Sequence, residues 1–323
     1  MGRLFSIGEV LIDFIPMQKG KALKDVQSFK RAPGGAPANV AAAVARFGAE
    51  SAIITKLGMD AFSDFLIEEL QKIGVKTDKI KRTKEANTGL AFVSLLDDGE
   101  RDFSFYRNPS ADLLLSEDEI EESWFAKGDI LHFCSVDLVE SPMKKAHEKA
   151  IRLVKENGGI ISFDPNVRLP LWNSAEDCRQ TILEFIPKAH IIKISDEELA
   201  FITGISNEKE AIENLFTGDV KAVIYTKGAN GADLYTKNAK YESTGFKVEV
   251  QDTTGAGDAF IGGFLYKLLE KEVNHDNLID VLNEHHQEIL TFANASGAIT
   301  TTGKGAISSL PTKEEILNFI SCK

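Results

Sequence analysis

Short hydrophobic runs alternate with amphipathic stretches along most of the chain. The runs are rich in β-branched and aromatic residues, which is typical of strands. They occupy residues 4–10, 51–56, 130–133, 159–164, 191–194, 222–226 and 246–250. Between several of them, hydrophobic residues recur at helical spacing, for example from Phe62 to Ile73 and from Met143 to Val154. This alternation predicts an α/β fold, with a mostly parallel sheet covered on both faces by helices.

Two regions, at about residues 12–33 and 88–107, break this rhythm. In the second, two strand-like segments flank a hairpin signal at 97–100, with no crossover helix between them. The alternation after the turn places four side chains on one face: Arg101, Phe103, Phe105 and Arg107. We expect both regions to form a small β lid that stands off the main sheet, within a single domain of residues 1–323. An ordinary edge hairpin is the alternative.

The composition is that of an intracellular globular protein. Of the 323 residues, 43% are hydrophobic, which is enough for a substantial core. No apolar run approaches the roughly 18 residues of a transmembrane helix, and the first residues lead directly into a strand-like segment without the apolar stretch of a signal peptide. The three cysteines, Cys134, Cys178 and Cys322, are too sparse for a disulfide framework. We therefore expect a cytoplasmic protein.

The net charge of −12 narrows the range of partners. Nucleic acids and membrane surfaces attract proteins through basic patches, so neither is expected as a partner. An acidic surface still admits a small anionic ligand, because backbone amides, a few basic side chains and a metal ion can supply local attraction.

The strongest candidate for chemistry is a glycine-rich string at residues 252–258, Asp-Thr-Thr-Gly-Ala-Gly-Asp. It lies between the expected strand 246–250 and a helical run that begins near Phe260. Glycines let the backbone approach an anion, and the amides at a helix start point at phosphate charge. The carboxylate of Asp258, inside the same turn, can accept a hydroxyl proton during attack on a phosphate. The bland alternative is an aspartate that stabilises the helix dipole by about 0.3–1 kcal/mol.

A second glycine pair, Gly34 and Gly35, precedes another helix. Paired glycines allow close backbone approach to a ligand, and Asn39 can both donate to and accept from a hydroxyl group. Asp13 lies in a hydrophobic run, where a buried carboxylate requires polar partners such as hydroxyl groups. The alternative for the glycine pair is a helix-initiating turn that uses Pro37, and the alternative for Asp13 is a solvated strand end.

These two strings closely resemble the two signatures of the PfkB, or ribokinase-like, carbohydrate kinases, and the resemblance extends from Gly8 to Pro311. It implies a ribokinase-like three-layer sandwich with a mostly parallel central sheet and a small β lid. It also implies that Asp258 is the catalytic base. The other roles that it implies are an anion hole (the amides of Gly255, Ala256 and Gly257), a sugar site (Asp13, Gly34, Gly35 and Asn39) and part of a monovalent-cation site (Asp252 and Thr254).

Three further stretches are similar to the fructokinases of this family, at residues 101–112, 163–172 and 194–199. The similarity implies transfer of the ATP γ-phosphate to the 6-hydroxyl of D-fructose, with Arg168 stabilising phosphate charge. A packing role is the alternative for Arg168. The same similarity places Phe103 and Arg107 at the sugar, on the inner face of the β lid, which would exclude water from the transfer site.

Other substrates and one other class of protein remain open. The 2-keto-3-deoxygluconate kinases share the arginine features, and Arg101 and Arg107 keep this alternative open. Phe103 and Phe105 on the expected β lid favour a neutral sugar over a sugar acid. A nucleoside kinase is a further option. A non-catalytic regulator that binds sugar or ATP would be expected to lack Asp258 or the Gly-Ala-Gly turn, and both are present in this chain.

The expected metal sites also follow from the resemblance. Glu198 matches the acidic end of a motif that handles Mg²⁺ through water, although Ser195 stands where the family usually has Asn. A capping box formed by Ser195 and Glu198 is the alternative, and both roles can hold together. Gly305 and Ser309 would complete the monovalent-cation site, with K⁺ as an option.

The expected nucleotide site is spread over several segments. The resemblance implies ATP ligands at Thr226, Gly228, Gly231, Asn294 and Gly297. Lys193 is a further candidate that would face a nucleotide phosphate, and a solvated lysine is the alternative. Taken alone, residues 226–231 need be no more than a hairpin turn, and small residues near 294–297 more often mean close helix packing. Members of the family are often dimers, so the resemblance also implies a homodimer formed through the β lid.

Overall fold

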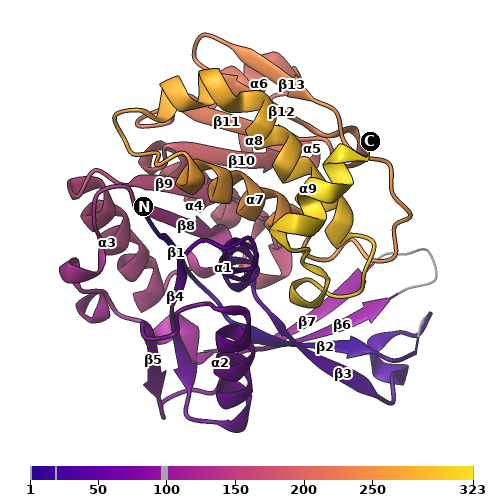
Figure 1. The fold of residues 1–323 in the computed structure, drawn as a ribbon. Coiled ribbons are helices and arrows are strands. Elements are labelled where there is room, and N and C mark those ends of the chain that lie inside the picture. The colour runs from indigo at the N-terminus through magenta and orange to yellow at the C-terminus, as the bar shows by residue number, and fades with distance from the viewer. Residues whose placement is uncertain (1, 19, 96–100, 323) are drawn as a thin grey trace.

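The computed structural model describes residues 2–18, 20–95 and 101–322, with the side chains of 94, 95 and 101–103 left out. Its largest feature is a sheet of nine strands in the order β13-β12-β11-β10-β9-β8-β1-β4-β5 (Figure 1). The strands are β1 Leu4–Ile7, β4 Ser51–Gly58, β5 Ile80–Thr83, β8 Ile130–Cys134, β9 Ile160–Asp164, β10 Ile191–Ser195, β11 Ala222–Thr226, β12 Ala232–Thr236 and β13 Lys240–Ser243. Neighbours from β5 to β11 are parallel, and β12 and β13 add antiparallel pairs at one edge.

Helices cover both faces of this sheet (Figure 1). Neighbouring strand residues point to opposite faces, so Ile160 of β9 packs into one core and Ile161 into the other. The first core lies under α1 Ala36–Arg46, α2 Ala61–Ile73, α7 Ala256–Glu270, α8 Leu278–Thr300 and α9 Lys313–Ser321. The second lies under α3 Pro142–Glu156, α4 Ala175–Phe185, α5 Asp196–Thr203 and α6 Glu208–Asn214. The predicted three-layer α/β arrangement with a mostly parallel sheet is confirmed.

Local sequence sets where the helices begin and end. Asp60 accepts a hydrogen bond from the N–H of Ser63 at 2.9 Å and starts α2, which ends at Gly74 in the left-handed conformation. The capping box that the sequence indicates at Ser195 and Glu198 is present at the start of α5. None of the helices in the described residues combines the length and the apolar composition that a membrane crossing requires.

Four strands form a second sheet beside the first, in the order β3-β2-β6-β7 (Figure 1, lower right). They are β2 Leu11–Pro16, β3 Phe29–Gly34, β6 Leu90–Leu95 and β7 Arg101–Tyr106. β2 pairs antiparallel with β3 and parallel with β6, and β6 pairs antiparallel with β7. This sheet falls in the two regions where the sequence predicts the β lid, and we use that name for it. The hairpin turn expected at 97–100 lies outside the described residues, and the closing of the lid over a substrate stays a prediction.

One predicted strand is wrong, because residues 246–250 form no strand. They follow β13 at the edge of the main sheet, where no described strand pairs with them. Val250 is 55% exposed, and Phe246 packs on Phe319 of α9 with 5.1 Å between ring centroids. The alternating pattern therefore reflects a segment that crosses the surface. Such a pattern yields a strand only where a neighbouring strand is available to pair with it.

Candidate active site

A cavity of about 650 Å³ lies between the β lid and the carboxyl ends of the central strands. Ligands of open α/β sheets gather at this position. The cavity is lined by many of the residues that the sequence singles out: Asp13, Gly35, Asn39, Arg168, Lys193, Glu198, Thr254, Gly255, Gly257 and Asp258. Segments from both ends of the chain therefore meet around one space that is large enough for a small molecule.

The turn before α7 requires its glycines. Gly255 has a φ of +76°, and a Cβ at this position would lie 2.5 Å from the Cβ of Ala306. Both the left-handed backbone and the close contact exclude a side chain. The N–H of Ala256 donates to the carbonyl of Thr253 at 3.2 Å, so this member of the expected anion hole is engaged within the turn. The backbone at Gly255 and Gly257 lines the cavity at the start of the helix, where amides attract anions.

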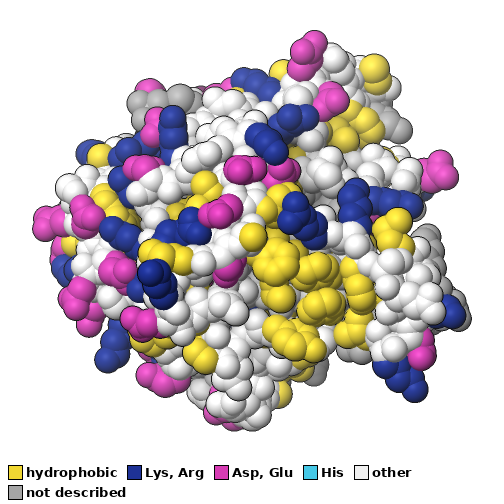
Figure 2. Space-filling model, turned by 90° about the horizontal axis from the view of Figure 1, so that it is seen from below, with side chains coloured by type: hydrophobic (Ala, Val, Ile, Leu, Met, Phe, Trp, Pro, Cys, Tyr) yellow, Lys and Arg dark blue, Asp and Glu magenta, His cyan; other side chains and the backbone are white. Residues whose placement is uncertain are grey.

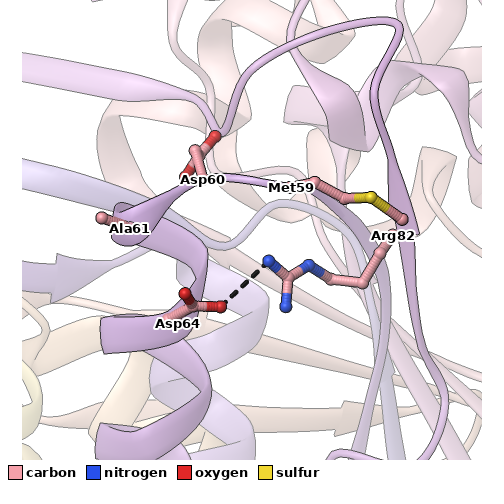
Figure 3. A pocket seen from close by; sticks show the side chains of 5 residues that line it. All are labelled: Met59, Asp60, Ala61, Asp64 and Arg82. Atoms are coloured by element: carbon pink, nitrogen blue, oxygen red, sulfur yellow. Dashed lines mark hydrogen bonds and ion pairs between the residues drawn. The ribbon is translucent and has the colours of Figure 1, made fainter.

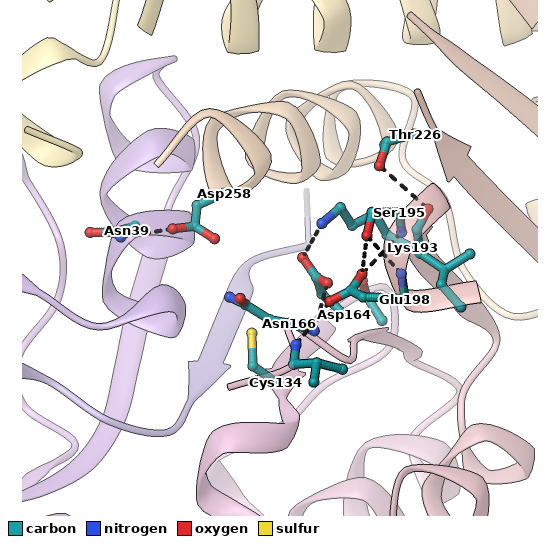
Figure 4. A network of polar contacts seen from close by, with 12 residues as sticks. Asn39, Cys134, Asp164, Asn166, Lys193, Ser195, Glu198, Thr226 and Asp258 are labelled. Carbon is teal, nitrogen blue, oxygen red and sulfur yellow. Dashed lines mark hydrogen bonds and ion pairs between the residues drawn. The ribbon is translucent and has the colours of Figure 1, made fainter. Parts of the chain in front are cut away.

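Asp258 lies in the first turn of α7 and is held by α1 (Figure 4). The side-chain amide of Asn39 donates to Asp258 Oδ2 at 2.8 Å. Burial raises the pKa of Asp258, while the hydrogen bond from Asn39 and the positive charges of Lys193 and Arg168 act in the opposite direction. The oxygen of the Asn39 amide, Oδ1, is buried and has no hydrogen-bond partner among the described residues. The pair thus presents the carboxylate of Asp258 to whatever fills the cavity, while the amide oxygen of Asn39 is buried.

The glycine pair before α1 allows β2 to pass close by. A Cβ on Gly34 would lie 2.2 Å from Asp13 Oδ2, and one on Gly35 would lie 2.3 Å from the carbonyl oxygen of Glu9. Gly35 lines the cavity and Gly34 does not, so the lack of a side chain at Gly34 makes room for Asp13. The N–H of Ala36 donates to Glu9 Oε1 at 2.9 Å, which fixes the turn.

Glu9 is a cavity-lining residue that sequence reasoning missed. Its side chain is only 4% exposed, and its Oε2 has no hydrogen-bond partner among the described residues. Burial, followed by the charge of Asp137, raises the pKa of Glu9 well above its usual range. A carboxyl group between Gly8 and Val10, in a hydrophobic run, was the available signal, because a buried acid requires a specific surrounding.

The opposite wall of the cavity carries Arg168, Lys193 and Glu198, and Asp164 is the buried partner of Lys193. Lys193 in the middle of β10 forms an ion pair with Asp164 at the end of β9, with 2.9 Å from Nζ to Oδ2 (Figure 4). Glu198 accepts from the N–H of Val167 at 2.8 Å through Oε1, and from Ser195 through Oε2. Arg168 is exposed at the rim of the cavity. Asp164 is a second residue that the sequence analysis did not single out.

Phe103 and Arg107 were expected at the sugar, on the inner face of the β lid. The side chain of Phe103 lies outside the described residues, but Phe105, on the same face of β7, lines the cavity. Arg107 is not among the lining residues. It is 8% exposed and donates to Asp112 and Asp137 beneath the β lid. The structure therefore places Arg107 in a buried ion cluster at the base of the β lid, rather than at the sugar, because the strand enters the core at its end.

The expected nucleotide ligands beyond Lys193 lie outside this cavity but close to one another. A Cβ on Gly231 would lie 2.1 Å from the carbonyl oxygen of Ser243, and Asn294 donates to the Ser243 hydroxyl at 3.0 Å. Gly297 packs against the carbonyl of Ala256, so packing accounts for its small size. The Thr226 hydroxyl donates to the carbonyl of Ile194 at 3.4 Å, and a Cβ on Gly228 would meet open space. Binding of ATP by these residues stays a prediction.

The residues expected at a monovalent cation meet beneath the 253–258 turn. Asp252 accepts from the N–H of Thr254 at 2.9 Å and from the N–H of Gly305 at 2.9 Å. The Ser309 side chain packs against the backbone at Gly303, close to the same loop. This arrangement joins the two loops through one carboxylate and places several oxygens near each other, which suits a hard cation. Occupation by a cation stays a prediction.

A second hollow, of about 440 Å³, lies at the start of α2 and holds none of the predicted site residues (Figure 3). It is lined by Met59, Asp60, Ala61, Asp64 and Arg82. Arg82 pairs with Asp64 at 3.0 Å, and Asp60 accepts from the N–H of Thr88 at 2.8 Å. Its charged side chains form ion pairs and hydrogen bonds with each other and with the backbone. These contacts join α2 to the segments that follow it.

The chain matches the family described as pfkB family carbohydrate kinase over residues 1–313. Among curated relatives, probable fructokinase-2 of Arabidopsis thaliana is 44% identical over 320 residues, which cover 99% of this chain and 96% of the relative.

Solved structures are similar over the same extent. Fructokinase from Xylella fastidiosa with bound ATP has a TM-score of 0.91 and 36% identity, and the match covers 99% of this chain and 98% of that chain. Fructokinase from Vibrio cholerae O395, in a form that binds fructose, ADP and a calcium ion, has a TM-score of 0.86 and 35% identity, with 99% of each chain covered. At such identities and scores, the likeness extends beyond the fold to the sequence.

Proposed function

The chain belongs to the pfkB family of carbohydrate kinases, and from that membership we propose that it transfers the γ-phosphate of ATP to the 6-hydroxyl of D-fructose. The family, the ribokinase-like fold and the ATP-dependent sugar kinase activity expected from the sequence are confirmed. The observation that carries the proposal is Asp258 at the start of α7, which Asn39 orients in the cavity beneath the β lid. The relatives that are named fructokinases support fructose as the acceptor.

Asp258 serves as the general base. Asn39 binds its Oδ2, which leaves Oδ1 to accept the proton of the 6-hydroxyl as that oxygen attacks the γ-phosphorus. Burial raises the pKa of Asp258 and so increases its basicity, while Asn39, Lys193 and Arg168 favour the ionised form that the reaction needs. A positioned base contributes about 10²–10⁴-fold to the rate.

Charge on the transferring phosphoryl group is met by the backbone amides at Gly255 and Gly257, by Lys193 and by Arg168. Mg²⁺, bound with ATP, neutralises further phosphate charge. Glu198 fits the water shell of that ion better than direct contact, because both of its oxygens already accept hydrogen bonds. Among the described residues, no group of three His, Cys, Asp or Glu side chains is placed to hold a metal, which suits an ion that arrives with the nucleotide. K⁺ is the proposed occupant of the site at Asp252.

The lid wall favours fructose over the second candidate, 2-keto-3-deoxygluconate. That sugar acid carries a carboxylate, for which Arg101 and Arg107 were the candidate partners, and the side chain of Arg101 lies outside the described residues. Arg107 instead donates to Asp112 and Asp137 outside the cavity, and Phe105 lines the cavity from the same strand. The described lid residues that line the cavity, Leu11, Asp13 and Phe105, include no cation. Such a wall suits a neutral sugar, because an unpaired carboxylate is costly to bury.

We also propose a homodimer formed through the outer face of the β lid. Asp13 and Phe105 line the cavity, so the neighbouring residues Phe14 and Tyr106 lie on the opposite face. There Phe14 stacks on Phe92 with 4.7 Å between centroids, and Tyr106 is 64% exposed. Figure 2 shows hydrophobic side chains gathered in one area on the side of the molecule that carries α2 and the β lid. A second copy of the chain would cover this aromatic face from water.

The proposed location is the cytoplasm. All three cysteines are free thiols, and Cys134 and Cys178 are buried, as is usual for proteins of reducing compartments. Fractionation of the host cell tests the assignment, and recovery of the protein from an organelle would overturn it.

One panel of acceptors tests the substrate. ADP release from ATP is measured with Mg²⁺ and K⁺ in the presence of fructose, ribose, 2-keto-3-deoxygluconate or adenosine, with repeats that omit either ion. We expect the highest kcat/KM with fructose, and loss of turnover without Mg²⁺. A higher kcat/KM for another acceptor would replace fructose. Absence of stimulation by any acceptor would instead favour the non-catalytic regulator.

A further inference from the structure

A buried ion pair stands directly behind the phosphoryl-transfer turn. β9 and β10 are parallel neighbours, with Ile192 beside Phe163, and the next residue of each strand is Lys193 and Asp164. The Lys193 ammonium and Asp164 Oδ2 are 2.9 Å apart, and their side chains are 9% and 1% exposed. A contact so deeply buried is held in one geometry, in contrast to the mobile ion pairs of a protein surface.

The same ammonium faces Gly257 in the glycine turn, at a position where a larger residue would bring its side chain against it. A Cβ placed on Gly257 would lie 3.3 Å from Lys193 Nζ. The ammonium is therefore packed between the Asp164 carboxylate and the backbone that carries Asp258 (Figure 4). Burial alone would lower the pKa of Lys193, but Asp164, Glu198 and Asp258 together raise it above its usual range. The lysine keeps its positive charge at the place where negative charge develops during transfer.

Asp164 also shapes the loop that leads to Arg168. Its Oδ1 accepts from the N–H of Asn166 at 3.2 Å, and Asn166 has the unusual φ of +44°. Glu198 holds the next residue of the loop by accepting from the N–H of Val167. One oxygen of Asp164 thus folds the loop, and the other fixes the lysine.

We propose that Asp164 is a positioning residue for phosphoryl transfer, which holds the Lys193 ammonium against the Gly257 turn so that it meets the γ-phosphoryl group. This inference rests on the proposed function, because it takes the turn as the site of transfer. The side chain of lysine is a flexible stem with a point charge at its end. In a polar cavity, such a side chain can adopt several conformations. A fixed counter-ion removes that freedom before the nucleotide binds.

Two substitutions and their combination test the claim. Asp164→Asn keeps an oxygen for Asn166 and removes the charge that holds Lys193, and we expect kcat to fall about 10–100-fold. Lys193→Met should lower kcat about 10²–10³-fold. If Asp164 acts through Lys193, the double variant should match Lys193→Met alone, within about twofold. The KM for fructose should change less than about twofold in each, because neither residue belongs to the sugar end of the cavity.

Asp129→Asn provides the matched control. Asp129 is equally buried and pairs with Arg3 at 3.1 Å, at the amino end of β8, away from the cavity. This variant should lose stability, because Asp129 is 2% exposed although its partner Arg3 is 34% exposed, with kcat within about twofold of the unchanged protein. Equal losses of kcat in Asp129→Asn and Asp164→Asn would show a general loss of structure and overturn the proposal.

A binding measurement separates this inference from the choice of sugar. Calorimetry without sugar compares the affinities for Mg·ATP and Mg·ADP, which differ by the γ-phosphate. Asp164→Asn and Lys193→Met should both lower the preference for ATP over ADP by about three- to tenfold, and Asp129→Asn should not. An unchanged preference in Asp164→Asn, or kcat losses that multiply in the double variant, would overturn the positioning role. The expected loss of preference in a protein that fails to phosphorylate fructose would contradict the proposed substrate alone.

Discussion

The side-chain amide of Asn39 donates to Asp258 Oδ2 at 2.8 Å, across 219 positions of the chain. This bond joins the helix that follows the first glycine pair to the helix that follows the second glycine string. It fixes the orientation of the carboxylate, and it leaves the amide oxygen of Asn39 without a partner among the described residues. The carboxylate that we propose as the base is therefore positioned by a side chain from the other end of the chain.

The pH dependence of Asn39→Ala follows from this bond. The hydrogen bond from Asn39 lowers the pKa of Asp258 against the raising effect of burial, so its removal should raise that pKa further. The base must be ionised, and activity falls as the pH drops through its pKa. The acid limb of the kcat/KM profile for fructose should therefore move to higher pH in Asn39→Ala. A limb that stays in place, or moves to lower pH, would contradict the assignment of Asp258 as the base that Asn39 orients.

The turn before α7 should tolerate no side chain at Gly255. In Gly255→Ala, the left-handed backbone alone costs about 1–2 kcal/mol, and the clash with Ala306 adds a further cost of about 1–3 kcal/mol. Gly228→Ala isolates the first effect, because Gly228 is also left-handed but a Cβ there would meet open space. Urea unfolding should show the larger loss of stability in Gly255→Ala. Equal losses in the two variants would mean that the contact with Ala306 is relieved at no cost.

The ion cluster under the β lid should make stability depend on pH. Burial raises the pKa of Asp137 to about 7, although Arg107 opposes the shift. In the unfolded chain the pKa of this carboxyl group is about 4. Between the pKa values of the unfolded and the folded form, the folded form therefore holds the proton more tightly. Its contribution to stability is therefore complete below about pH 4 and is lost as the pH rises through 7.

Asp137→Asn keeps the neutral form at every pH. Its free energy of unfolding relative to the unchanged protein should rise from pH 5 to pH 8, by at most about 1.4 kcal/mol per pH unit. Glu270→Gln serves as the control, because its pKa, despite burial, is lowered to about 2 by Lys267 and Lys313. The contribution of Glu270 is present above its unfolded value and lost only as the pH falls through 2, so its variant should show a flat difference over the same range. Urea unfolding at four pH values measures both, and a flat line for Asp137→Asn would contradict the raised pKa of Asp137.

The dimer prediction depends on the aromatic outer face of the β lid. Tyr106→Asp places a charge on that face, where Tyr106 is 64% exposed, and should convert the dimer to a monomer at micromolar concentration. Leu317→Asp is the control, because Leu317 is 48% exposed on α9, away from the β lid. Sedimentation of the three proteins over a broad concentration series measures the mass. A monomeric mass for the unchanged chain, or a dimer that survives Tyr106→Asp, would remove this interface.

The sequence predicts the parts of the fold and the site that depend on local pattern. The helices at α2 and α3 follow from hydrophobic spacing, and the start of α7 follows from the glycine string that ends in Asp258. Predictions from local pattern are wrong where a residue distant in the sequence determines the structure. Residues 246–250 alternate like a strand but have no strand beside them, and Arg107 follows the alternation of β7 but turns into the core to meet Asp112 and Asp137.

The residues that sequence analysis missed were missed for the same reason. Asp164 ends a hydrophobic strand, and its ion pair exists only because β10 lies beside β9 with Lys193 in register. Glu9 lines the cavity because Gly35 allows the next turn to pass within contact of its backbone. In both cases, the strand register and the turn geometry assign the role, and neither can be read from residue type alone.

The most direct test of Asp258 as the general base is the turnover of Asp258→Asn with fructose. The asparagine keeps the size of the side chain and removes the carboxylate that accepts the proton, so the account predicts a fall in kcat of about 10²–10⁴-fold. Fructose affinity, measured by calorimetry, and the thermal unfolding midpoint should stay close to those of the unchanged protein. A well-folded Asp258→Asn protein that still phosphorylates fructose at a near-normal rate would contradict the account.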